Sequence, residues 1–345
     1  MKQFYKEVIR TIEGDTGAIA TIIFQSGSSP RGLGAQMLIR ADGSAVGSVG
    51  GGRLEAEVME AAQEVMEKGH PKRLEFHLTG QEVADSDMIC GGEVEVLLEP
   101  LAPQFLDLFK GLLELLERDK RALLFTQLPP APWGKVLLPE RGSPVGTLPK
   151  ERVEEIQALM EKHPELWQQQ RPFSMSLKPG VHLFVEPISS EPTLYLFGGG
   201  HVAQQIAPLA KMVGFRVVVL DDRPDYANRD RFPVADDIVV EDFARVAERV
   251  PVEENSYLVI VTRGHMHDYT VLKQFLRSPA RYIGMIGSRR KRDAIYRRLL
   301  EEGFSEEELA RVHAPIGLDI GAETPEEIAV SVVAEMIKVR RSSHR

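Results

Sequence analysis

One glycine-rich loop in the sequence has the spacing of a nucleotide-binding turn. Gly198, Gly200 and Ala203 form a GxGxxA pattern directly after the apolar run 194–197, and a helical stretch follows them. In such a pattern the first glycine allows a tight turn, the second lets the backbone approach a pyrophosphate, and the small third residue permits close helix–strand packing. Backbone amides at the helix start would meet the phosphates. We therefore predict a nucleotide site made by Gly198, Gly199, Gly200, His201, Val202 and Ala203.

Two acidic residues follow the next apolar run at the distance that ribose recognition requires. The run 215–220 is followed by Asp221 and Asp222, about 20 residues beyond the glycines, where a carboxylate binds a ribose hydroxyl in dinucleotide-binding folds. Arg223 comes next and favours a phosphate, so the sequence leaves open whether the ligand is NAD-like or another nucleotide. The alternative is that the glycines serve only a strand–helix turn and the acids cap the next loop. No Tyr-x-x-x-Lys pair accompanies the pattern, and a fold alone does not establish a dehydrogenase.

Polar residues follow two further apolar runs of this half. His265 and Asp268 come after one run, and Ser288 and Arg289–Arg290 come after the next. In an open α/β sheet ligands sit outside the carboxyl ends of the strands, so we expect these side chains at the same crevice. For the first two we favour ligand binding or loop ordering over a metal site, and no metal centre is predicted. For the second group we favour anion binding, whereas the basic residues 291–292 are expected to form a solvated surface.

Two loops and the single cysteine point to a ligand site in the first half. The glycine-rich stretch 47–52 lies between a strand-like and a helical run, which is typical of a backbone-amide anion site. Ser28, Ser29 and Arg31 add hydroxyls and a guanidinium that suit phosphate or carboxylate. Cys90 precedes two glycines, and we favour a functional role over an ordinary buried cysteine. The candidate residues here are Ser28, Ser29, Arg31, Gly50, Gly51, Gly52 and Arg53 for ligand binding and Cys90 for chemistry.

The elements that must position these residues differ between the two halves. From residue 193 onward short apolar runs alternate with helical stretches, which is typical of a parallel sheet covered on both faces. The first half mixes a hairpin signal at Asp42-Gly43 with amphipathic helical stripes, and its sequence shows no internal repeat. We predict an α/β protein with a mixed α/β domain at 1–190 and a Rossmann-type doubly wound parallel sheet at 191–345.

Composition excludes several classes of protein. The 345 residues carry a net charge of −9, which argues against nonspecific nucleic-acid binding because that binding depends on neutralising phosphates. No apolar run reaches the length of a membrane span, and the start lacks the apolar stretch of a signal peptide. With one cysteine, no intramolecular disulfide can form. We expect a cytoplasmic protein that binds neither nucleic acid nor membranes.

Taken in order, the motifs resemble those of the XdhC/CoxI family, the accessory proteins of xanthine dehydrogenase and related molybdenum hydroxylases. The resemblance covers nearly the whole chain apart from its middle region. The matching segments are Gly27–Arg31, Gly47–Glu55, Cys90–Gly92, Phe197–Ala203, Asp221–Pro224, Tyr282–Gly284, Ile286–Arg290, Pro315–Gly321 and Thr324–Ala329.

This resemblance implies a homodimeric chaperone, rather than a turnover enzyme, that binds molybdenum cofactor (molybdopterin), supports its sulfuration and delivers it to a xanthine dehydrogenase-type molybdenum hydroxylase. A cysteine desulfurase is a second expected partner. Cys90 would contact the cofactor or handle sulfur, and the N-terminal glycine loops would hold its phosphate or nucleotide. Two departures are visible: Arg53 stands where some members have a second cysteine, and Thr262–His265 replaces the family's Thr-His-Asp-His. The alternatives are an NAD(P)-dependent oxidoreductase and a nucleotide-responsive regulatory module.

Overall fold

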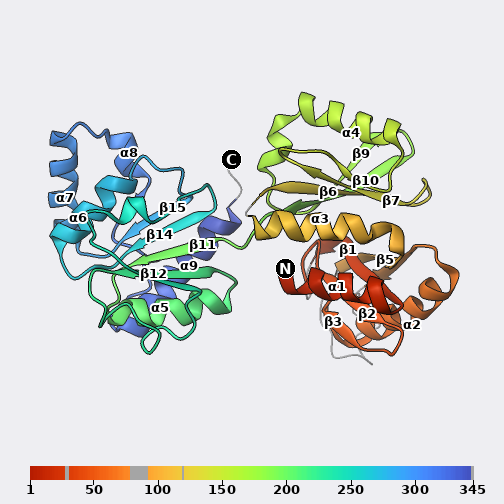
Figure 1. Cartoon of the computed structure of the whole chain (residues 1–345), viewed down its shortest axis with the longest axis horizontal. Helices are drawn as coiled ribbons and strands as arrows, with labels where there is room; N and C mark the ends of the chain where they lie inside the picture. Colours follow the sequence, from red (N-terminus) through yellow and green to blue (C-terminus); the bar gives the residue numbers. More distant parts are fainter. Residues whose placement is uncertain (28–30, 78–91, 119, 343–345) are drawn as a thin grey trace. The chain divides into compact units, whose positions relative to one another are not determined.

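The computed structural model describes residues 1–27, 31–77, 92–118 and 120–342. The chain separates into two compact units, Met1–Ser190 and Glu191–Arg345. Figure 1 shows the elements of each unit. Among the described residues, no helix is both long and apolar enough to cross a membrane.

The second unit alternates strands and helices along its whole length. Its elements are β11 (Thr193–Phe197), α5 (His201–Met212), β12 (Arg216–Asp221), β13 (Asp237–Val240), η4 (Val246–Glu248), β14 (Ser256–Ile260), α6 (His265–Phe275), β15 (Tyr282–Met285), α7 (Arg289–Glu301), α8 (Glu306–Ala310), β16 (Val312–His313) and α9 (Pro325–Arg341). Within the described part of this unit, six strands form one parallel sheet in the order β13-β12-β11-β14-β15-β16. The predicted doubly wound Rossmann-type sheet is therefore confirmed.

Both faces of this sheet are covered, which explains its continuous apolar strands. Leu194 and Leu196 of β11 pack with α5 and α9 on one face. Tyr195 and Phe197 point to the other face, where α6 and α7 pack. The strand order reverses between β11 and β14, and this switch point is where ligands bind in open α/β sheets.

The first unit contains antiparallel sheets flanked by helices. Its elements are α1 (Lys2–Gly14), β1 (Gly17–Gly27), β2 (Gln36–Arg40), β3 (Ala45–Gly47), α2 (Gly52–Lys68), β4 (Lys72–His77), β5 (Gly92–Pro100), η2 (Pro103–Phe105), α3 (Leu106–Glu117), β6 (Ala122–Gln127), β7 (Gly134–Pro139), β8 (Val145–Gly146), α4 (Lys150–Lys162), η3 (Pro164–Gln168), β9 (Phe173–Lys178) and β10 (Val181–Ile188). In the residues described, the strands form two five-stranded sheets, β3-β2-β1-β5-β4 and β8-β7-β6-β10-β9. The predicted mixed α/β architecture is confirmed.

This unit is a structural repeat that the sequence does not reveal. Across the described residues, the order helix, three strands, helix, two strands occurs twice, and the two sheets have matching strand orders. Helices α1 and α3 lie together between the sheets, while α2 and α4 cover the outer faces (Figure 1). Tyr5 and Phe109, the fourth residues of α1 and α3, stack with ring centroids 5.8 Å apart. Equivalent residues therefore meet at a pseudo-two-fold axis.

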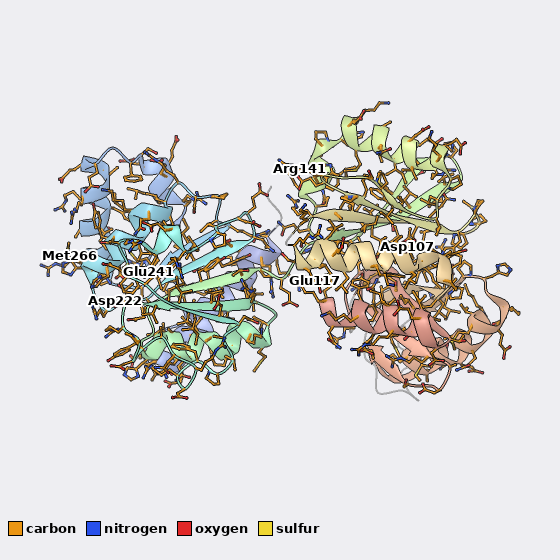
Figure 2. All side chains as sticks on the ribbon, in the orientation of Figure 1. Asp107, Glu117, Arg141, Asp222, Glu241 and Met266 are labelled. Carbon is orange, nitrogen blue, oxygen red and sulfur yellow. The ribbon has the colours of Figure 1, made fainter. Side chains whose placement is uncertain are left out.

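Reciprocal ion pairs between α1 and α3 support this pseudo-symmetry. Lys6 of α1 pairs with Glu117 of α3 at 3.8 Å, and Lys110 of α3 pairs with Glu13 of α1 at 2.7 Å. Lys6 and Lys110 are each the fifth residue of their helix, and Glu13 and Glu117 are each the twelfth. Such mutual pairing is typical of an isologous interface between two like subunits. Figure 2 labels Glu117 near the end of α3.

Polar residues buried between the two sheets repeat the same reciprocity. Gln36 of β2 donates from Nε2 to Glu186 of β10 at 2.9 Å, and Lys135 of β7 pairs with Glu99 of β5 at 2.7 Å. Both pairs join equivalent strands of opposite repeats, and both glutamates are nearly fully buried. The symmetry is broken because the first repeat supplies a neutral amide where the second supplies an ammonium. Two buried carboxylates thus share one nearby lysine.

Glu186 makes the stability of this unit depend on pH. Burial raises its pKa from 4.5 to about 7, with attraction to Lys135 opposing the shift and repulsion from Glu99 adding to it. A carboxyl with a raised folded-state pKa contributes most stability below its unfolded pKa and loses it as pH rises to the folded pKa. Relative to wild type, Glu186→Gln is therefore expected to gain up to about 3 kcal/mol between pH 4 and pH 8. Urea unfolding at both pH values measures this difference.

The matched control is Glu75→Gln, which changes an exposed glutamate of β4. It should leave the pH profile of wild type unchanged. If the free energies of unfolding of wild type and Glu186→Gln differed by the same amount at pH 4 and at pH 8, the raised pKa of Glu186 would be contradicted.

Candidate functional site

The glycine turn of the second unit lies at the switch point between β11 and β14. Gly198 has φ +110°, and a Cβ there would lie 2.5 Å from the carbonyl oxygen of Val261 at the end of β14. Its N–H donates to the carbonyl oxygen of Leu220 at 2.7 Å, which closes the turn against β12. Gly200 is the N-cap of α5, and a Cβ there would meet nothing within 4 Å. The turn thus requires glycine at 198 and leaves open space beside 200.

Position 199 must be glycine because of a contact within the protein, not because a pyrophosphate has to approach the backbone there. A Cβ at this position would collide with the backbone carbonyl of Tyr226, so the protein's own chain makes the close approach. His201 is exposed at the first residue of α5, Val202 is half-buried, and Ala203 is fully buried against the sheet. The small Ala203 therefore allows the close helix–sheet packing expected of this pattern.

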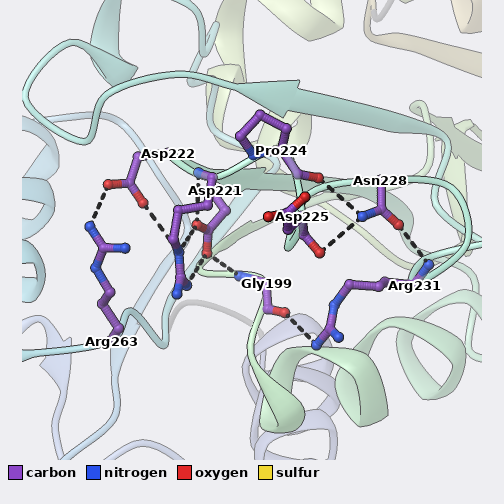
Figure 3. Close-up of polar contacts among 9 residues, drawn as sticks. Gly199, Asp221, Asp222, Pro224, Asp225, Asn228, Arg231 and Arg263 are labelled. Carbon is purple, nitrogen blue, oxygen red and sulfur yellow. Dashed lines mark hydrogen bonds and ion pairs between the residues drawn. The ribbon is translucent and has the colours of Figure 1, made fainter.

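The Asp221 carboxylate is fully engaged by neighbouring groups (Figure 3). Its Oδ2 accepts from the Gly199 N–H at 2.8 Å and from Arg223 Nη2 at 3.1 Å. Its Oδ1 accepts from Arg223 Nε at 2.9 Å and from the Arg223 backbone N–H at 3.1 Å. Because a carboxylate has about four lone-pair sites, none is left in this arrangement for the predicted ribose hydroxyl. Burial alone would raise the pKa of Asp221, but the hydrogen bonds from Arg223 and Gly199 outweigh burial and hold it below its ordinary value.

Three arginines surround this carboxylate and the glycine turn. Arg263 pairs with Asp222 at 2.7 Å, and Arg231 donates to the Gly199 carbonyl at 3.1 Å (Figure 3). The guanidinium of Arg223 lies 3.5 Å from the ring centroid of Tyr226, and that of Arg231 lies 5.0 Å from the same ring. Asp222, Glu241 and Met266, labelled in Figure 2, each follow the carboxyl end of a strand and lie on the same side of the unit.

Asp268 orders a loop from a fully buried position. Its Oδ1 accepts from the Thr262 backbone N–H at 3.2 Å and from Thr262 Oγ1 at 2.5 Å, while Oδ2 accepts from Lys291. Burial raises the pKa of Asp268 above its ordinary value, although Lys291 and Thr262 oppose the shift. Of the two predicted roles, ligand binding and loop ordering, the geometry shows the second. The prediction that Lys291 is merely solvated is wrong, because Lys291 pairs with the buried Asp268.

Histidines near this loop do not gather into a metal site. His265 is exposed at the first residue of α6, and His267 packs against the ring of Phe243 at 5.2 Å. Within the part of the chain that the structure describes, no group of three or more His, Cys, Asp or Glu side chains could hold a metal ion.

The first turn of α7 concentrates positive charge at the end of a helix that disfavours it. Ser288 is the N-cap and accepts from the Lys291 N–H at 3.3 Å, and no acidic residue lies in the first turn. Arg292 pairs with Asp293 and also donates to a backbone carbonyl, so it is not simply solvated as predicted. Arg289 and Arg290 are exposed, and neither forms an ion pair with any described residue. The helix dipole repels cations at a helix N-terminus. A bound anion would therefore stabilise Arg289 and Arg290 more than it would stabilise other surface arginines.

The predicted anion loop of the first unit already holds a carboxylate. Glu55 Oε1 accepts from the backbone N–H groups of Val49 at 3.0 Å and Gly50 at 3.2 Å, and from Ser48 Oγ at 2.6 Å. Burial opposes ionisation of Glu55, but these hydrogen bonds keep its pKa below the ordinary value. Glu55 therefore already occupies backbone N–H groups that an external anion at this loop would use.

The remaining predicted residues of this unit are placed in part. Arg53 pairs with Glu57 at 2.6 Å, and Arg31 is exposed. Ser28, Ser29 and Cys90 lie outside the described residues, so the structure does not place them.

Sequence reasoning missed Tyr226, Arg231 and Glu55 as parts of these sites. The carboxylate in the first turn of α2, directly after the glycines, is the one local signal that could have identified Glu55. No local pattern identifies the other two, because a loop returns them to the glycine turn.

Comparisons with known proteins match both units. Residues 194–336 match a family model described as the XdhC Rossmann domain, and residues 12–77 match one described as the XdhC and CoxI family. The first range includes the glycine turn and the starts of α6 and α7, while the second includes the glycine loop before α2. Cys90 lies outside both ranges.

Individual relatives are similar over nearly the whole chain. The uncharacterized Escherichia coli protein YqeB is 27% identical over 94% of this chain, but the chain spans only 44% of that protein. A Bacillus subtilis protein described as a probable subunit of xanthine dehydrogenase is 27% identical over 95% of this chain and 94% of its own length. The E. coli molybdenum cofactor insertion chaperone PaoD is 23% identical over 95% of this chain and 85% of its own.

One solved structure has the same fold. A Bacillus halodurans protein described as a xanthine dehydrogenase matches with a TM-score of 0.80 and 28% identity, over 99% of this chain and 97% of that one.

Proposed function

The chain belongs to the XdhC and CoxI family, and from this premise we propose that it is an accessory protein of a xanthine dehydrogenase-type molybdenum hydroxylase. In this proposal it binds molybdenum cofactor, supports its sulfuration with a cysteine desulfurase, and delivers it to the apo-enzyme. Relatives named for xanthine dehydrogenase and for molybdenum cofactor insertion support the accessory role. The protein would then be a chaperone that passes on its ligand, rather than a turnover enzyme.

The observation that carries a ligand site is the positive charge at the start of α7, which is not paired with any carboxylate among the residues that the structure describes. Arg289 and Arg290 are exposed there, at the positive end of the helix dipole. The strands β11 and β15, which lead into α5 and α7, are separated by β14, so their carboxyl ends are about 10 Å apart across two strand spacings. An elongated anionic ligand can thus contact both helix starts along the carboxyl edge of the sheet.

The residues at this edge fit a phosphate-bearing cofactor. Molybdenum cofactor carries its metal on a pterin that ends in a phosphate, and it supplies the redox centre of the hydroxylase that receives it. Arg289 and Arg290 would hold that phosphate through charge-assisted hydrogen bonds, and Ser288 adds a hydroxyl beside them. The open space at Gly200 and the exposed His201 leave the start of α5 accessible to the rest of the ligand.

The Arg289→Gln/Arg290→Gln double variant tests this assignment. It is expected to bind molybdenum cofactor at least about tenfold more weakly than wild type, because two charge-assisted contacts are lost. Cofactor released from a molybdoenzyme is mixed with the full-length protein under anaerobic conditions, and equilibrium dialysis gives the Kd.

Arg297→Gln is the matched control, because Arg297 is exposed on the same helix away from its first turn. It should retain the wild-type Kd. Absence of binding by wild type at micromolar cofactor would reject the chaperone proposal. Equal losses in the double variant and the control would reject the phosphate site but not the chaperone role.

Cys90→Ala, measured in the same way, tests the role that the family resemblance gives to the cysteine. A weaker Kd would support direct contact between Cys90 and the cofactor. A Kd equal to that of wild type would remove Cys90 from the binding site and leave the proposal for the second unit unchanged.

A nucleotide-responsive regulatory module is the second candidate function. The Gly198 turn favours it, because the turn keeps the geometry of a nucleotide-binding loop. An NAD-dependent oxidoreductase is less well supported, since Asp221 has no acceptor position left for a ribose diol. Tight binding of a nucleotide without binding of molybdenum cofactor would favour the regulatory module.

A further inference from the structure

The cluster around Asp221 determines what kind of ligand can occupy the β12 end of the Rossmann unit. In a dinucleotide site of ordinary type, the acid at the end of the second strand accepts hydrogen bonds from a ribose diol. Here Asp221 accepts four hydrogen bonds, three of them from Arg223, and is only 1% exposed. A ligand that reaches this end therefore meets the guanidinium of Arg223 in place of a free carboxylate.

Arg223 keeps donor capacity after binding Asp221. A guanidinium has five N–H groups, and the Asp221 side chain takes one from Nε and one from Nη2, which leaves three. The Arg223 side chain is 27% exposed, so the remaining edge is accessible. The ring of Tyr226, 3.5 Å away, covers one face and fixes the plane. A guanidinium held in this way can bind a phosphate through two parallel N–H groups.

The arginines around Arg223 are matched in number by carboxylates, but Arg231 does not pair with any carboxylate that the structure describes. Asp221 pairs with Arg223, and Asp222 pairs with Arg263 at 2.7 Å and with Arg223 at 3.6 Å. Arg231, on the same Tyr226 ring, gives its hydrogen bonds to neutral oxygen atoms, those of Gly199 and Gln204. Its Nε is buried without a hydrogen-bond partner among the described residues. Asp225 is exposed nearby, so the attraction for an anion is directional rather than a matter of bulk charge.

We propose that Arg223, held by Asp221 and Tyr226, is a specificity-determining residue that selects a ligand with a phosphate monoester at the β12 end and rejects an unphosphorylated ribose diol. The inference rests on the proposed ligand-binding function of this unit. The phosphate monoester is that of a nucleotide phosphorylated on its ribose, since the proposed function places the phosphate of the cofactor at Arg289 and Arg290. Asp221 acts as the positioning residue for Arg223 and for the glycine turn.

Paired nucleotides that differ by one phosphate test the proposal. Full-length protein is titrated by calorimetry with 2′,5′-ADP and with 5′-AMP. Wild type is expected to bind 2′,5′-ADP at least tenfold more tightly. Arg223→Gln should reduce that preference to less than twofold, because the phosphate loses its donor and Asp221 regains acceptor positions for a ribose diol. Arg223→Lys keeps the charge without the fork and should recover only part of the preference.

Arg229→Gln is the control, because Arg229 is an exposed arginine of the same loop that donates to backbone carbonyls instead of Asp221. Far-UV circular dichroism checks that each variant is folded. Equal affinity of wild type for the two nucleotides, or tighter binding of 5′-AMP, overturns the proposal, and so does an unchanged preference in Arg223→Gln.

Two further measurements separate this inference from the proposed function. Displacement of bound 2′,5′-ADP by molybdenum cofactor would place the cofactor phosphate at Arg223 and contradict its assignment to Arg289 and Arg290, whereas absence of displacement would support a nucleotide as the ligand of Arg223. Preference for 2′,5′-ADP without any cofactor binding would uphold the role of Arg223 and reject the chaperone proposal. Cofactor binding that depends on Arg289 and Arg290, without binding of either nucleotide, would uphold the chaperone proposal and reject the role of Arg223.

Discussion

Lys135→Met is expected to lower the free energy of unfolding of the first unit by about 3–5 kcal/mol at pH 7.5, because it leaves a buried carboxylate without its counter-ion. Lys135 is nearly buried, pairs with Glu99 at 2.7 Å and donates to Thr126 at 2.8 Å. Glu186 lies close enough for Lys135 to lower its pKa. The loss should be smaller at pH 5, where a carboxyl can be neutralised by protonation.

Urea unfolding followed by tryptophan fluorescence measures this effect selectively. The two tryptophans of the chain, Trp133 and Trp167, both lie in the first unit, so the signal reports that unit alone. Lys110→Met is the control, since its side chain is half exposed in the reciprocal pair between α1 and α3, and exposed pairs contribute little. Lys135→Met/Glu99→Gln should recover part of the loss. A loss below about 1 kcal/mol for Lys135→Met would contradict the argument.

The repeat in the first unit escaped sequence analysis because its two copies share pattern rather than identity. Ile19 of the first copy occupies the register of Leu124 in the second, whereas the equivalent positions 38 and 137 are both leucine, so the core keeps apolar character more strictly than residue type. The spacing along the chain also differs, because 14 residues separate β4 from β5, whereas two separate β9 from β10. Long-range pairing of equivalent strands, which no local pattern records, is what identifies the repeat.

More of the Rossmann unit than of the first unit could be predicted from the sequence, because the patterns that identify it lie close together along the chain. A glycine turn, an apolar strand on each side and an acid about 20 residues later are all read along the chain. The same spacing predicts Asp221 at the end of β12, where the structure has it, but does not predict its hydrogen bonds with Arg223 and Gly199. Arg223 and Tyr226 determine these hydrogen bonds, because the loop after β12 folds back onto Gly199. Spacing in the sequence predicts where a carboxylate lies in the fold, but it does not predict which donors form hydrogen bonds with that carboxylate.

Asp268→Ala is expected to destabilise the second unit by about 3 kcal/mol, because it removes a buried carboxylate and leaves its donors unpaired. The Thr262 N–H and hydroxyl lose their acceptor, and the ammonium of Lys291, 23% exposed, loses its counter-ion. These groups join the loop after β14 to the helix after β15. The loop that carries His265 should therefore open more readily.

Amide hydrogen exchange at Thr262 reports this opening directly. Protection of that amide should fall about a hundredfold in Asp268→Ala, in proportion to the loss of stability. Asp268→Asn keeps an oxygen acceptor for Thr262 but not the charge that faces Lys291, so its loss of protection should be intermediate. Asp293→Ala is the matched control, since Asp293 is a half-exposed carboxylate of α7 that pairs with Arg292. Equal protection of Thr262 in Asp268→Ala and in the control would show that Asp268 does not hold the loop, and the site would then be ordered by its backbone alone.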